Sequence, residues 1–487
     1  MSSREILASA SSLTTLDPGL PRAHPTQSFW QEPAHPLSST QSPSLPARTE
    51  ILILGSGITG CAIAKHLLEN SSDDQSITIL EARTLCSGAT GRNGGHLTSS
   101  APCDYLDLVA ALGKEQALKV ARFTLLNIEK VYALAKEVEG SEVRLVEGVM
   151  SCFDEEALEH ARASVDEFER DAVECRGKYT SVDANELEEK YGVRGTLGGL
   201  VVPAGAIWPY RLVTSLYAQL VSRYPDRFCI ETSTPATEIS FDSDSGFYNV
   251  TTPRGNIQAR HVLHATNGHA GHLLPLLRGK IYPLRGTMTV QRSPPTFPNI
   301  GSTRSWSTHA RPTYDSTTGR CSLGLYYMTQ NAKTGDIFLG GEEKPLGEIL
   351  TSDDTTAGDG FAVQNLQDLP GAWFGEAVFP PEGKEERLRS SWSGIMGFTG
   401  DGLPLVGNLE EGLTGRKGGG EWIAAGFNGY GMVNCWMSGI AVANMVLGRG
   451  GDNKGWFPEA YLACEERLSE RINVETAFQD LFPLKEK

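Results

Sequence analysis

Residues 50–60, EILILGSGITG, decide the fold of this chain. The run from 50 to 55 is short and mostly apolar, as in a parallel strand that is buried on both faces. Gly55, Gly57 and Gly60 have the spacing G-x-G-x-x-G, and a helix is predicted over 61–69. In such a turn the first glycine permits a tight bend and the second lets phosphate groups approach the backbone. The third lets the helix pack on the strand.

A second predicted strand, 76–81, ends at Glu81, which lies 21 residues after Gly60. A carboxylate in this place accepts hydrogen bonds from the hydroxyls of an unphosphorylated ribose. Strand, glycine turn, helix and acid together predict a dinucleotide site; the alternative is a glycine turn without a ligand. The residues expected to form this part of the site are Gly55, Ser56, Gly57, Ile58, Thr59, Gly60, Glu81 and Ala82.

Segments far along the chain favour FAD over NAD as the dinucleotide. Residues 257–268 form an apolar strand that ends in Ala-Thr-Asn-Gly. Residues 401–407 precede 422–432, where another strand runs into a glycine-rich turn and a helix. FAD is the longer cofactor and is usually held from both ends of the chain, whereas a simple NAD dehydrogenase rarely needs its last residues for this. An NAD-only dehydrogenase is the alternative.

The composition is that of a soluble globular protein of more than one domain. Of the 487 residues, 43 are Lys or Arg and 59 are Asp or Glu, and the net charge of −16 argues against nucleic acid or anionic lipid as a partner. The nine cysteines are scattered without a C-x-x-C pair, as in a protein with reduced thiols. No apolar run reaches the length of a membrane span. We expect a cytoplasmic protein, either a monomer or a homodimer.

Five motifs resemble those of the D-amino-acid oxidase and sarcosine oxidase-like family of FAD-dependent amine oxidoreductases. The resemblance covers about 50–465, and it is most similar to a fungal-type branch and, among bacterial patterns, to gamma-glutamylputrescine oxidase. The motifs are SGATGRNGGHL (87–97), GAIWPYRL (205–212), ATNGH (265–269), WSGIMGFTGDGLPLVG (392–407) and GFNGYGM (426–432).

The resemblance implies an α/β, two-domain flavoprotein. A Rossmann-like FAD-binding domain would comprise 49–100, 200–280 and 385–465, and a substrate domain with a mostly antiparallel sheet would comprise 101–199 and 281–384. Residues 1–48 are a Ser/Pro-rich arm, expected to be extended or disordered, whose pair Phe29–Trp30 either docks on the folded body or is incidental. Residues 466–487 are a C-terminal tail. The loops 344–360 and 409–420 are predicted to be exposed and mobile.

The same resemblance assigns further contacts to FAD. The loop after Glu81 would pass along the pyrophosphate, the ribityl chain and the flavin ring, although a glycine-rich loop that only turns a corner is the alternative. The backbone of Ala236 would meet the adenine, and 426–432 would hold the pyrimidine end of the flavin. The additional residues implied are Arg83, Ser87, Thr90, Asn93, Gly94, Gly95, Ala236, Thr266, Gly268, Gly397, Asp401, Gly426, Asn428, Gly429, Tyr430, Gly431 and Met432.

Three positions depart from patterns known in the family. Some relatives attach FAD to a cysteine or to a histidine, and the matching positions here hold Gly394 and Arg92. We therefore predict non-covalent FAD, with His96 as the remaining candidate for a covalent link. The lysine that binds the substrate carboxylate in sarcosine oxidases is replaced by Val433, which favours a larger amine over a small amino acid.

The predicted reaction is oxidation of a C–N bond of an amine or amino-acid-like substrate to an imine, by hydride transfer to flavin N5, with O2 as acceptor and H2O2 as product. The candidate catalytic residues are His96, Arg285, Tyr327 and Tyr430, and sheet packing or a salt bridge is the alternative role for the tyrosines and the arginine. No metal is predicted, because His261 and His264 would point to opposite faces of a strand. The other readings are a specialised-metabolite flavin oxidase or dehydrogenase acting on an alkaloid-like amine, and a non-catalytic FAD-binding protein.

Overall fold

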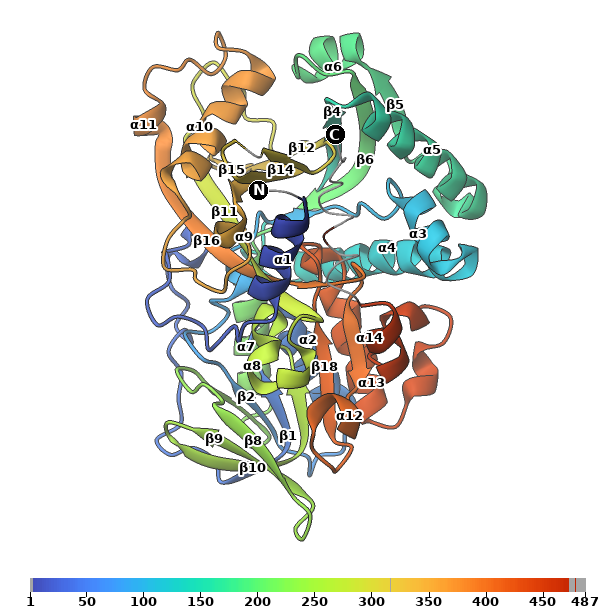
Figure 1. The fold of residues 1–487 in the computed structure, drawn as a ribbon. Coiled ribbons are helices and arrows are strands. Elements are labelled where there is room, and N and C mark those ends of the chain that lie inside the picture. Colours follow the sequence, from blue (N-terminus) through green and yellow to red (C-terminus); the bar gives the residue numbers. More distant parts are fainter. Residues whose placement is uncertain (1–2, 316, 473–477, 479–487) are drawn as a thin grey trace.

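The computed structural model describes residues 3–315, 317–472 and 478, and the chain is built around two sheets. Figure 1 shows the first sheet in the lower half of the molecule and the second in the upper half. The first sheet has the strand order β17-β18-β10-β1-β2-β7, with β8 and β9 beside β10. Its strands are β1 (Arg48–Leu54), β2 (Ile77–Leu80), β7 (Phe228–Glu231), β8 (Glu238–Asp242), β9 (Phe247–Thr252), β10 (Gly255–His264), β17 (Leu405–Asn408) and β18 (Glu421–Ala425).

The first sheet is the predicted Rossmann-like sheet. Strand β1 pairs in parallel with β2 and β10, and β10 pairs in parallel with β18. Alternate residues of β1 face opposite sides: Ile51 and Ile53 pack with the helices, whereas Leu52 and Leu54 pack with β8 and β9. The covering helices are α2 (Ile58–Asn70), α7 (Pro209–Arg223) and α13 (Cys435–Val446). Both faces of the parallel strands are thereby buried, as their continuous apolar sequences require.

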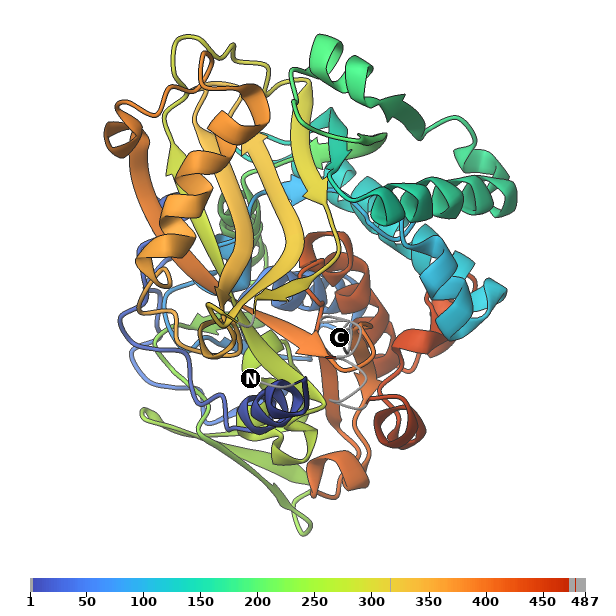
Figure 2. The ribbon, with the colours of Figure 1, turned by 45° about the horizontal axis from the view of Figure 1, so that its top comes forward.

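The second sheet is mostly antiparallel and has the order β16-β11-β15-β14-β12-β4-β6-β3, with β13 and β5 off this path. Only the pair β12–β4 is parallel among its described pairings. Figure 2 shows α10 lying along this sheet. Its strands are β3 (His96–Leu97), β4 (Arg144–Cys152), β5 (Thr180–Asp183), β6 (Gly198–Ala206), β11 (Ile281–Gln291), β12 (Arg304–His309), β13 (Thr313–Asp315), β14 (Arg320–Gln330), β15 (Ile337–Pro345) and β16 (Leu388–Thr399).

The remaining helices surround the two sheets. Residues 105–136 form two helices, because Gly113 ends the first with a φ of 75°. Within the described ranges, no helix is long and apolar enough to cross a membrane. These helices are α1 (Ser3–Thr14), α3 (Tyr105–Leu112), α4 (Lys114–Lys136), α5 (Glu155–Asp171), α6 (Ala184–Tyr191), α8 (Ala270–Leu273), α9 (Leu346–Ile349), α10 (Gly360–Phe374), α11 (Lys384–Arg387), α12 (Glu411–Thr414) and α14 (Glu465–Glu470).

Strand pairing differs from the expected domain ranges at three places. Strands β3, β6 and β16 all belong to the second sheet, although 49–100, 200–280 and 385–465 were expected in the FAD-binding domain. Strand β16 pairs along its length with β11, from Ile281 opposite Thr399 to Gln291 opposite Leu388. The chain therefore crosses between the sheets at the end of β16, just before β17.

Two further expectations are wrong. The arm is not extended or disordered over 3–14, which form α1 with Ile6 and Ala10 buried. The loop 344–360 is not simply exposed, because it contains α9, and Ile349 and Asp354 are buried. Apolar side chains at helical spacing drive both segments onto the body of the protein. Of the expected tail, residues 473–477 and 479–487 lie outside the described residues.

Candidate functional site

A cavity of about 820 Å³ extends from the carboxyl ends of β1, β2 and β10 to the second sheet. Leu54, Leu80 and Ala265 line it at the three strand ends. The carboxyl edge of a parallel sheet is the usual ligand crevice of such folds. The cavity continues past loop 87–95 toward β11, β12 and β14, so one continuous space joins the dinucleotide turn to the second sheet.

The glycine turn after β1 has the backbone that its sequence predicts. Gly55 has a φ of 105°, and a Cβ there would lie 2.6 Å from the carbonyl oxygen of Ala265. A Cβ on Gly60 would lie 2.1 Å from the carbonyl oxygen of Gly55, so the third glycine permits the close packing of α2 on its own turn. Gly60 does not line the cavity, whereas Gly55 and Gly57 do.

The amino terminus of α2 faces the cavity without a side-chain cap from its N-cap residue, Gly57. The backbone N–H of Ile58 donates to Thr90 Oγ1 at 3.0 Å, and both Ile58 and Thr59 line the cavity. Unpaired N–H groups and the positive end of the helix dipole favour an anion at such a terminus. The geometry therefore suits the pyrophosphate of a dinucleotide.

Glu81 is fixed at the end of β2 by three hydrogen bonds. Its Oε2 accepts from the backbone N–H of Ser56 at 3.1 Å and from the Ser56 hydroxyl at 2.6 Å, and its Oε1 accepts from the N–H of Arg83 at 2.9 Å. The carboxylate is 8% exposed and lines the cavity. Since each carboxylate oxygen has more than one acceptor site, Oε1 retains capacity for a ribose hydroxyl.

The loop 87–95 forms the wall between α2 and the second sheet. Thr90, Asn93 and Gly94 line the cavity, whereas Ser87 and Gly95 do not. A Cβ on Gly94 would lie 2.3 Å from Cε2 of Tyr327, which shows why this position has no side chain. The carbonyl of Ser87 accepts from Arg92 Nε at 2.7 Å and from Arg83 Nη2 at 3.1 Å, so this loop is braced by arginines.

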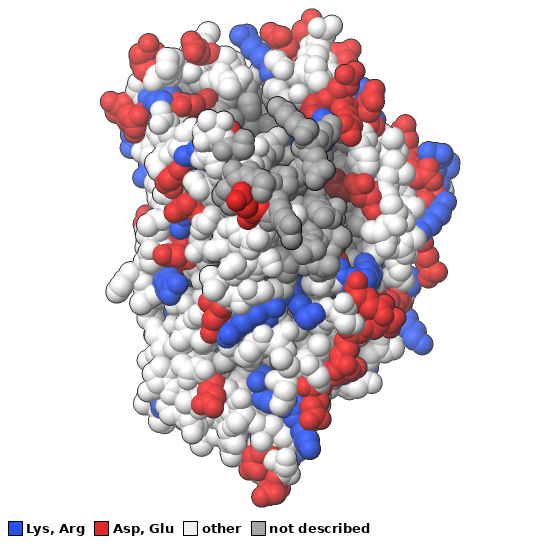
Figure 3. Space-filling model, viewed as in Figure 1, with Lys and Arg blue, Asp and Glu red and all other residues white. Residues whose placement is uncertain are grey.

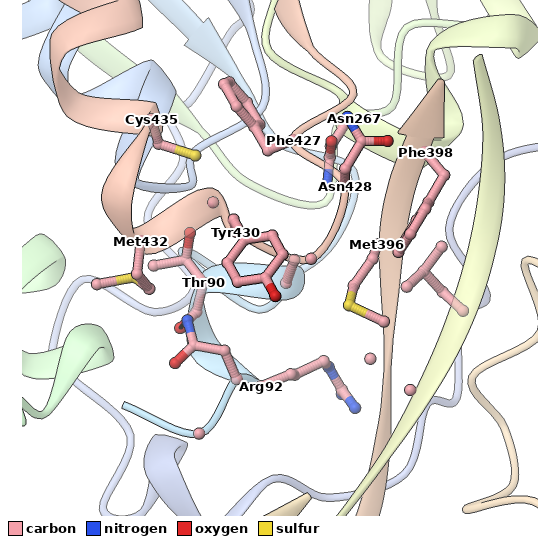
Figure 4. Close-up of a pocket in the computed structure, with 18 of the residues that line it drawn as sticks. Thr90, Arg92, Asn267, Met396, Phe398, Phe427, Asn428, Tyr430, Met432 and Cys435 are labelled. Carbon is pink, nitrogen blue, oxygen red and sulfur yellow. Dashed lines mark hydrogen bonds between the residues drawn. The ribbon is translucent and has the colours of Figure 1, made fainter. Parts of the chain in front are cut away.

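The glycine-rich turn 426–432 is tied to β16 and to the end of β10. Asn428 Oδ1 accepts from the N–H of Thr399 at 2.8 Å, and Asn267 Oδ1 accepts from the N–H of Gly426 at 3.0 Å. Figure 4 shows Asn267 and Asn428 side by side, with the ring of Tyr430 projecting into the cavity. Lining residues from this region that were expected to contact FAD are Thr266, Asn428, Gly429, Tyr430, Gly431 and Met432; from the adenine side they are Ala82, Arg83 and Ala236.

Several residues expected to contact FAD lie outside the cavity lining and make packing contacts. Asp401 does not line the cavity, because its carboxylate is buried against Arg467, with Nε 2.8 Å from Oδ2. Gly268 and Gly397 also lie outside the lining, where they let β16 pack closely against the end of β10: a Cβ on Gly397 would lie 2.5 Å from Oδ1 of Asn267. Gly426, likewise not in the lining, has a φ of 73° and turns the backbone after β18.

Three of the four candidate catalytic residues line the cavity. The Tyr327 hydroxyl donates to Met288 Sδ at 3.2 Å, and His96 Nε2 lies 2.8 Å from Ser305 Oγ. Burial lowers the pKa of His96 to about 4, and the charge of nearby Arg144 adds to this effect, so the imidazole is neutral at pH 7. Burial also raises the pKa of Tyr430 above its ordinary value.

Arg285, the fourth candidate, does not line the cavity. It is 3% exposed and forms an ion pair with Glu348, and its Nη1 donates to the carbonyl of Asp353 at 3.0 Å. Its neighbour Gly286 does line the cavity. Successive residues of a strand point to opposite faces, so the arginine points away from the site.

An acidic group that the sequence did not single out lines the cavity beyond Tyr430. Asp104 holds the N-cap position of α3, but its carboxylate makes no capping bond to the helix. Burial raises the pKa of Asp104, and nearby His309 lowers it. The Asp104 carboxylate contributes to the raised pKa of Tyr430, so the two side chains lie near each other. In a sequence, a single acidic residue before an apolar helical stripe indicates a helix cap. For this reason the sequence did not indicate that Asp104 lines the cavity.

The rim of the cavity beyond Asp104 is formed partly by α5. His160 Nε2 lies 2.9 Å from Asp107 Oδ2, and Arg311 Nη2 lies 2.9 Å from Asp154. Figure 3 shows acidic side chains gathered at the upper right, over α5 and α6. No cluster of three or more His, Cys, Asp or Glu side chains with the geometry of a metal site occurs in the described part of the chain.

The residues present fit FAD. The uncapped terminus of α2 and the Glu81 carboxylate lie at one part of the cavity, and the asparagine-braced turn 426–432 lies at another. Thr266 lines the cavity, and its buried hydroxyl has no hydrogen-bond partner among the described residues. A polar ligand that extends past Thr266 would satisfy it.

Comparison with known proteins identifies the family. The family model for FAD dependent oxidoreductases matches residues 50–445. A probable oxidoreductase OrdL of Rhizobium meliloti (strain 1021) is 23% identical over 447 residues, which are 86% of this chain and 90% of the relative. Glycine oxidase from Geobacillus kaustophilus has a TM-score of 0.63 at 19% identity, over 86% of this chain and 99% of the other. L-Proline dehydrogenase from P. horikoshii has a TM-score of 0.61 at 19% identity, over 86% and 97%. The chain belongs to the FAD-dependent oxidoreductase family.

Proposed function

We propose that this FAD-dependent oxidoreductase converts the C–N bond of an amine or amino-acid-like substrate to an imine, which water then hydrolyses. The observation that carries the proposal is the continuity of the cavity, which runs from the α2 terminus past Tyr430 to Asp104. Bound FAD supplies the hydride acceptor, and O2 takes up the two electrons and two protons to give H2O2. Family membership and the names of the structural neighbours, glycine oxidase and L-proline dehydrogenase, support this class of substrate.

The protein groups that would hold FAD lie along the cavity. The positive end of α2, at Ile58 and Thr59, would meet the pyrophosphate, and Glu81 would accept from the ribose. The backbone of 429–431 would lie at the flavin end. Dipoles from that turn would stabilise negative charge on the reduced flavin.

The charges along the cavity favour an amine over a simple carboxylate as the recognised group. The three arginines in the lining, Arg83, Arg92 and Arg311, are already bound to carboxylates or carbonyls of the protein. Asp104 is a carboxyl group without a capping role and with a pKa raised by burial. It would bind a cationic nitrogen of the substrate, and the net charge of −16 would draw such a substrate to the protein.

The remaining side chains would orient the substrate and exclude water. Neutral His96 and the Tyr327 hydroxyl stand on the second sheet, and Tyr430 projects into the cavity from the turn 426–432 (Figure 4). Hydride loss from an amine requires its C–H bond to be aimed at the acceptor, so positioning is the main catalytic task of these groups.

Anaerobic titration with amines tests the proposal. The purified protein is mixed with amines and amino acids without O2, and the absorbance of its flavin is followed. Bleaching by an amine, with H2O2 formed when air is admitted, is the expected result. Bleaching without H2O2 would indicate a dehydrogenase; bleaching only by an amine whose product cyclises would favour a specialised-metabolite enzyme. A flavin that no tested amine bleaches would favour the non-catalytic alternative.

A further inference from the structure

The N-terminal arm precedes the segment that matches the family, yet it lines the FAD cavity. The family match begins at residue 50, and Gly19, Leu20 and Pro21 are part of the cavity lining. These three residues lie between two anchors that hold the arm on the body. One anchor is α1, and the other is Trp30.

The first anchor is an apolar contact of α1 with the second sheet. Ile6 and Ala10 are buried in one cluster with Tyr282 and Leu284 of β11 and with Ile349 of α9. Figure 1 shows α1 in front of these elements. Burial of an apolar side chain is worth about 1.5–3 kcal/mol, so α1 holds this end of the arm in place.

The second anchor is the side chain of Trp30, which is 4% exposed. Its ring stacks on that of Phe338, with centroids 3.9 Å apart, and packs edge-on against Trp208. Its Nε1 donates to the carbonyl of Asn93 in the loop 87–95, and Trp208 Nε1 donates to the carbonyl of Trp30 at 2.7 Å. The anchor thus connects the arm directly to a loop that borders the cavity.

Between the anchors, the arm is held by polar contacts with the body of the protein. Asp17 pairs with Arg278 at 2.7 Å, and the Ser352 hydroxyl donates to the carbonyl of Pro18 at 2.6 Å. His269 Nδ1 lies 3.1 Å from the carbonyl oxygen of Gly19. Burial lowers the pKa of His269 to about 4, so the ring is neutral and its Nδ1–H donates this bond.

Thr26 joins the arm to the arginines of the cavity wall. Its carbonyl accepts from Arg92 Nη2 at 2.7 Å, and its N–H donates to the carbonyl of Asp354 at 2.7 Å. Asp354 in turn accepts from Arg83 Nη1 at 2.7 Å. Arg83 and Arg92 both line the cavity, so the arm is bound to two side chains of the cavity wall.

We propose that residues 17–26 are a strap that forms part of the FAD site and retains the cofactor. The strap covers the cavity beside Glu81 and Arg83, and it must leave this position for FAD to enter or depart. The contacts to be broken are mainly hydrogen bonds and ion pairs, whereas α1 and Trp30 keep the ends of the strap in place. A loop held at both ends recloses with a small entropic cost. This inference rests on FAD binding by the family and not on the identity of the substrate.

Two deletions distinguish the contribution of the strap to FAD retention from that of its first anchor, α1. Deletion of 1–15 removes α1 and leaves the strap, and deletion of 1–27 removes both but leaves Trp30. FAD release is followed by the rise in flavin fluorescence after dilution. We expect the 1–27 deletion to release FAD at least about tenfold faster than the 1–15 deletion. The reason is that loss of one wall of a binding site mainly increases the dissociation rate. Equal rates would overturn the proposal.

The full-length protein gives a second measurement that does not depend on how the deletions fold. The exposed Arg22 lies within the strap and is followed by Ala23, so trypsin can cleave there when the strap is lifted. Mass spectrometry would follow the fragment 1–22 with FAD removed and with FAD in excess. We expect FAD to slow this cleavage several-fold, and cleavage of a reference site such as Lys178 to stay unchanged. Equal cleavage at Arg22 in both states would overturn the proposal.

Discussion

A Cβ on Gly394 would lie 3.1 Å from the Cβ of Arg92, so these two residues face each other on the wall of the cavity. They stand at the two positions where the sequence resemblance places covalent flavin links in other enzymes. Gly394 has no side chain, and the Arg92 guanidinium is bound to the carbonyls of Ser87, Ser393 and Thr26. Neither residue offers a nucleophile to the flavin.

The first prediction is that the flavin is not covalently bound. After precipitation with acid, the yellow colour should appear in the supernatant with the absorbance of free FAD. His96 is the control: a His96→Ala variant should give the same partition. Colour in the pellet of the wild type, lost in His96→Ala, would identify that histidine as a site of attachment and contradict the prediction.

A second prediction concerns the Glu81 carboxylate and FAD affinity. Glu81→Gln replaces an acceptor of three hydrogen bonds by an amide whose NH2 group cannot accept from Ser56. Hydrogen bonds to charged groups contribute about 1.5–3 kcal/mol, so the dissociation constant of FAD should rise at least about tenfold. Flavin fluorescence titration of FAD-free protein measures the change. The matched exposed variant Glu129→Gln should bind FAD as the wild type does, and equal affinity in the two variants would contradict the role.

Much of the first sheet could be predicted because its signals are local. The glycine turn, the apolar run of β1 and the proline that begins α7 each determine backbone conformation within a few residues. The predicted helix 61–69 lies within α2. A Cβ at position 55 would clash with the carbonyl oxygen of Ala265, a residue far along the chain. The first glycine of the G-x-G-x-x-G motif already reflects that close contact.

The side chains of the site could be predicted less well because their direction depends on partners far along the chain. Arg285 lies on β11, and only the pairing of β11 with β15 and β16 sets which face of this strand meets the cavity. Asp104 has the sequence signal of a helix cap, and its exposure to the cavity depends on loop 426–432. The arm has a composition typical of disorder, but Trp30 fits a pocket formed by residues about 180 and 310 positions later.

A third prediction separates structure from cofactor binding at Asp401. Asp401→Asn leaves the buried Arg467 with an unpaired charge, because this pair is almost fully buried on both sides. Removal of one partner of a buried pair costs about 3–5 kcal/mol, so the midpoint of thermal unfolding should fall by several degrees. FAD affinity of the folded protein should stay within about twofold. Glu186 forms an exposed ion pair with Lys190, so Glu186→Gln serves as the control and should change stability little. A large loss of FAD affinity in Asp401→Asn would show that Asp401 contacts the cofactor.

A fourth prediction tests Asp104 as the group that binds the substrate cation. Asp104→Asn should raise the KM of an amine substrate roughly tenfold with a smaller change in kcat, since a charged hydrogen bond made in both ground and transition states is lost. FAD affinity should not change. Asp107→Asn, which removes the carboxylate partner of His160 at the rim, serves as the comparison and should have a smaller effect on KM. Equal KM values for Asp104→Asn and the wild type would contradict the assignment.

The last prediction concerns pH and two half-buried imidazoles, His96 and His269. Burial holds both pKa values at about 4, against 6.5 for an ordinary histidine. Between pH 4 and 6.5 these histidines bind protons in the unfolded chain but not in the folded protein. Their contribution to the free energy of unfolding is therefore fully present above pH 6.5 and decreases as the pH drops toward 4. Each histidine should lower the free energy of unfolding by about 1–3 kcal/mol at the acidic end of this range. Thermal unfolding of the FAD-loaded protein at pH 7.5 and 4.5 should therefore show a smaller acid destabilisation in His96→Gln and His269→Gln than in the wild type. The rim variant His160→Gln should show the same acid destabilisation as the wild type. If His96→Gln and His269→Gln also show it unchanged, other groups cause the acid sensitivity.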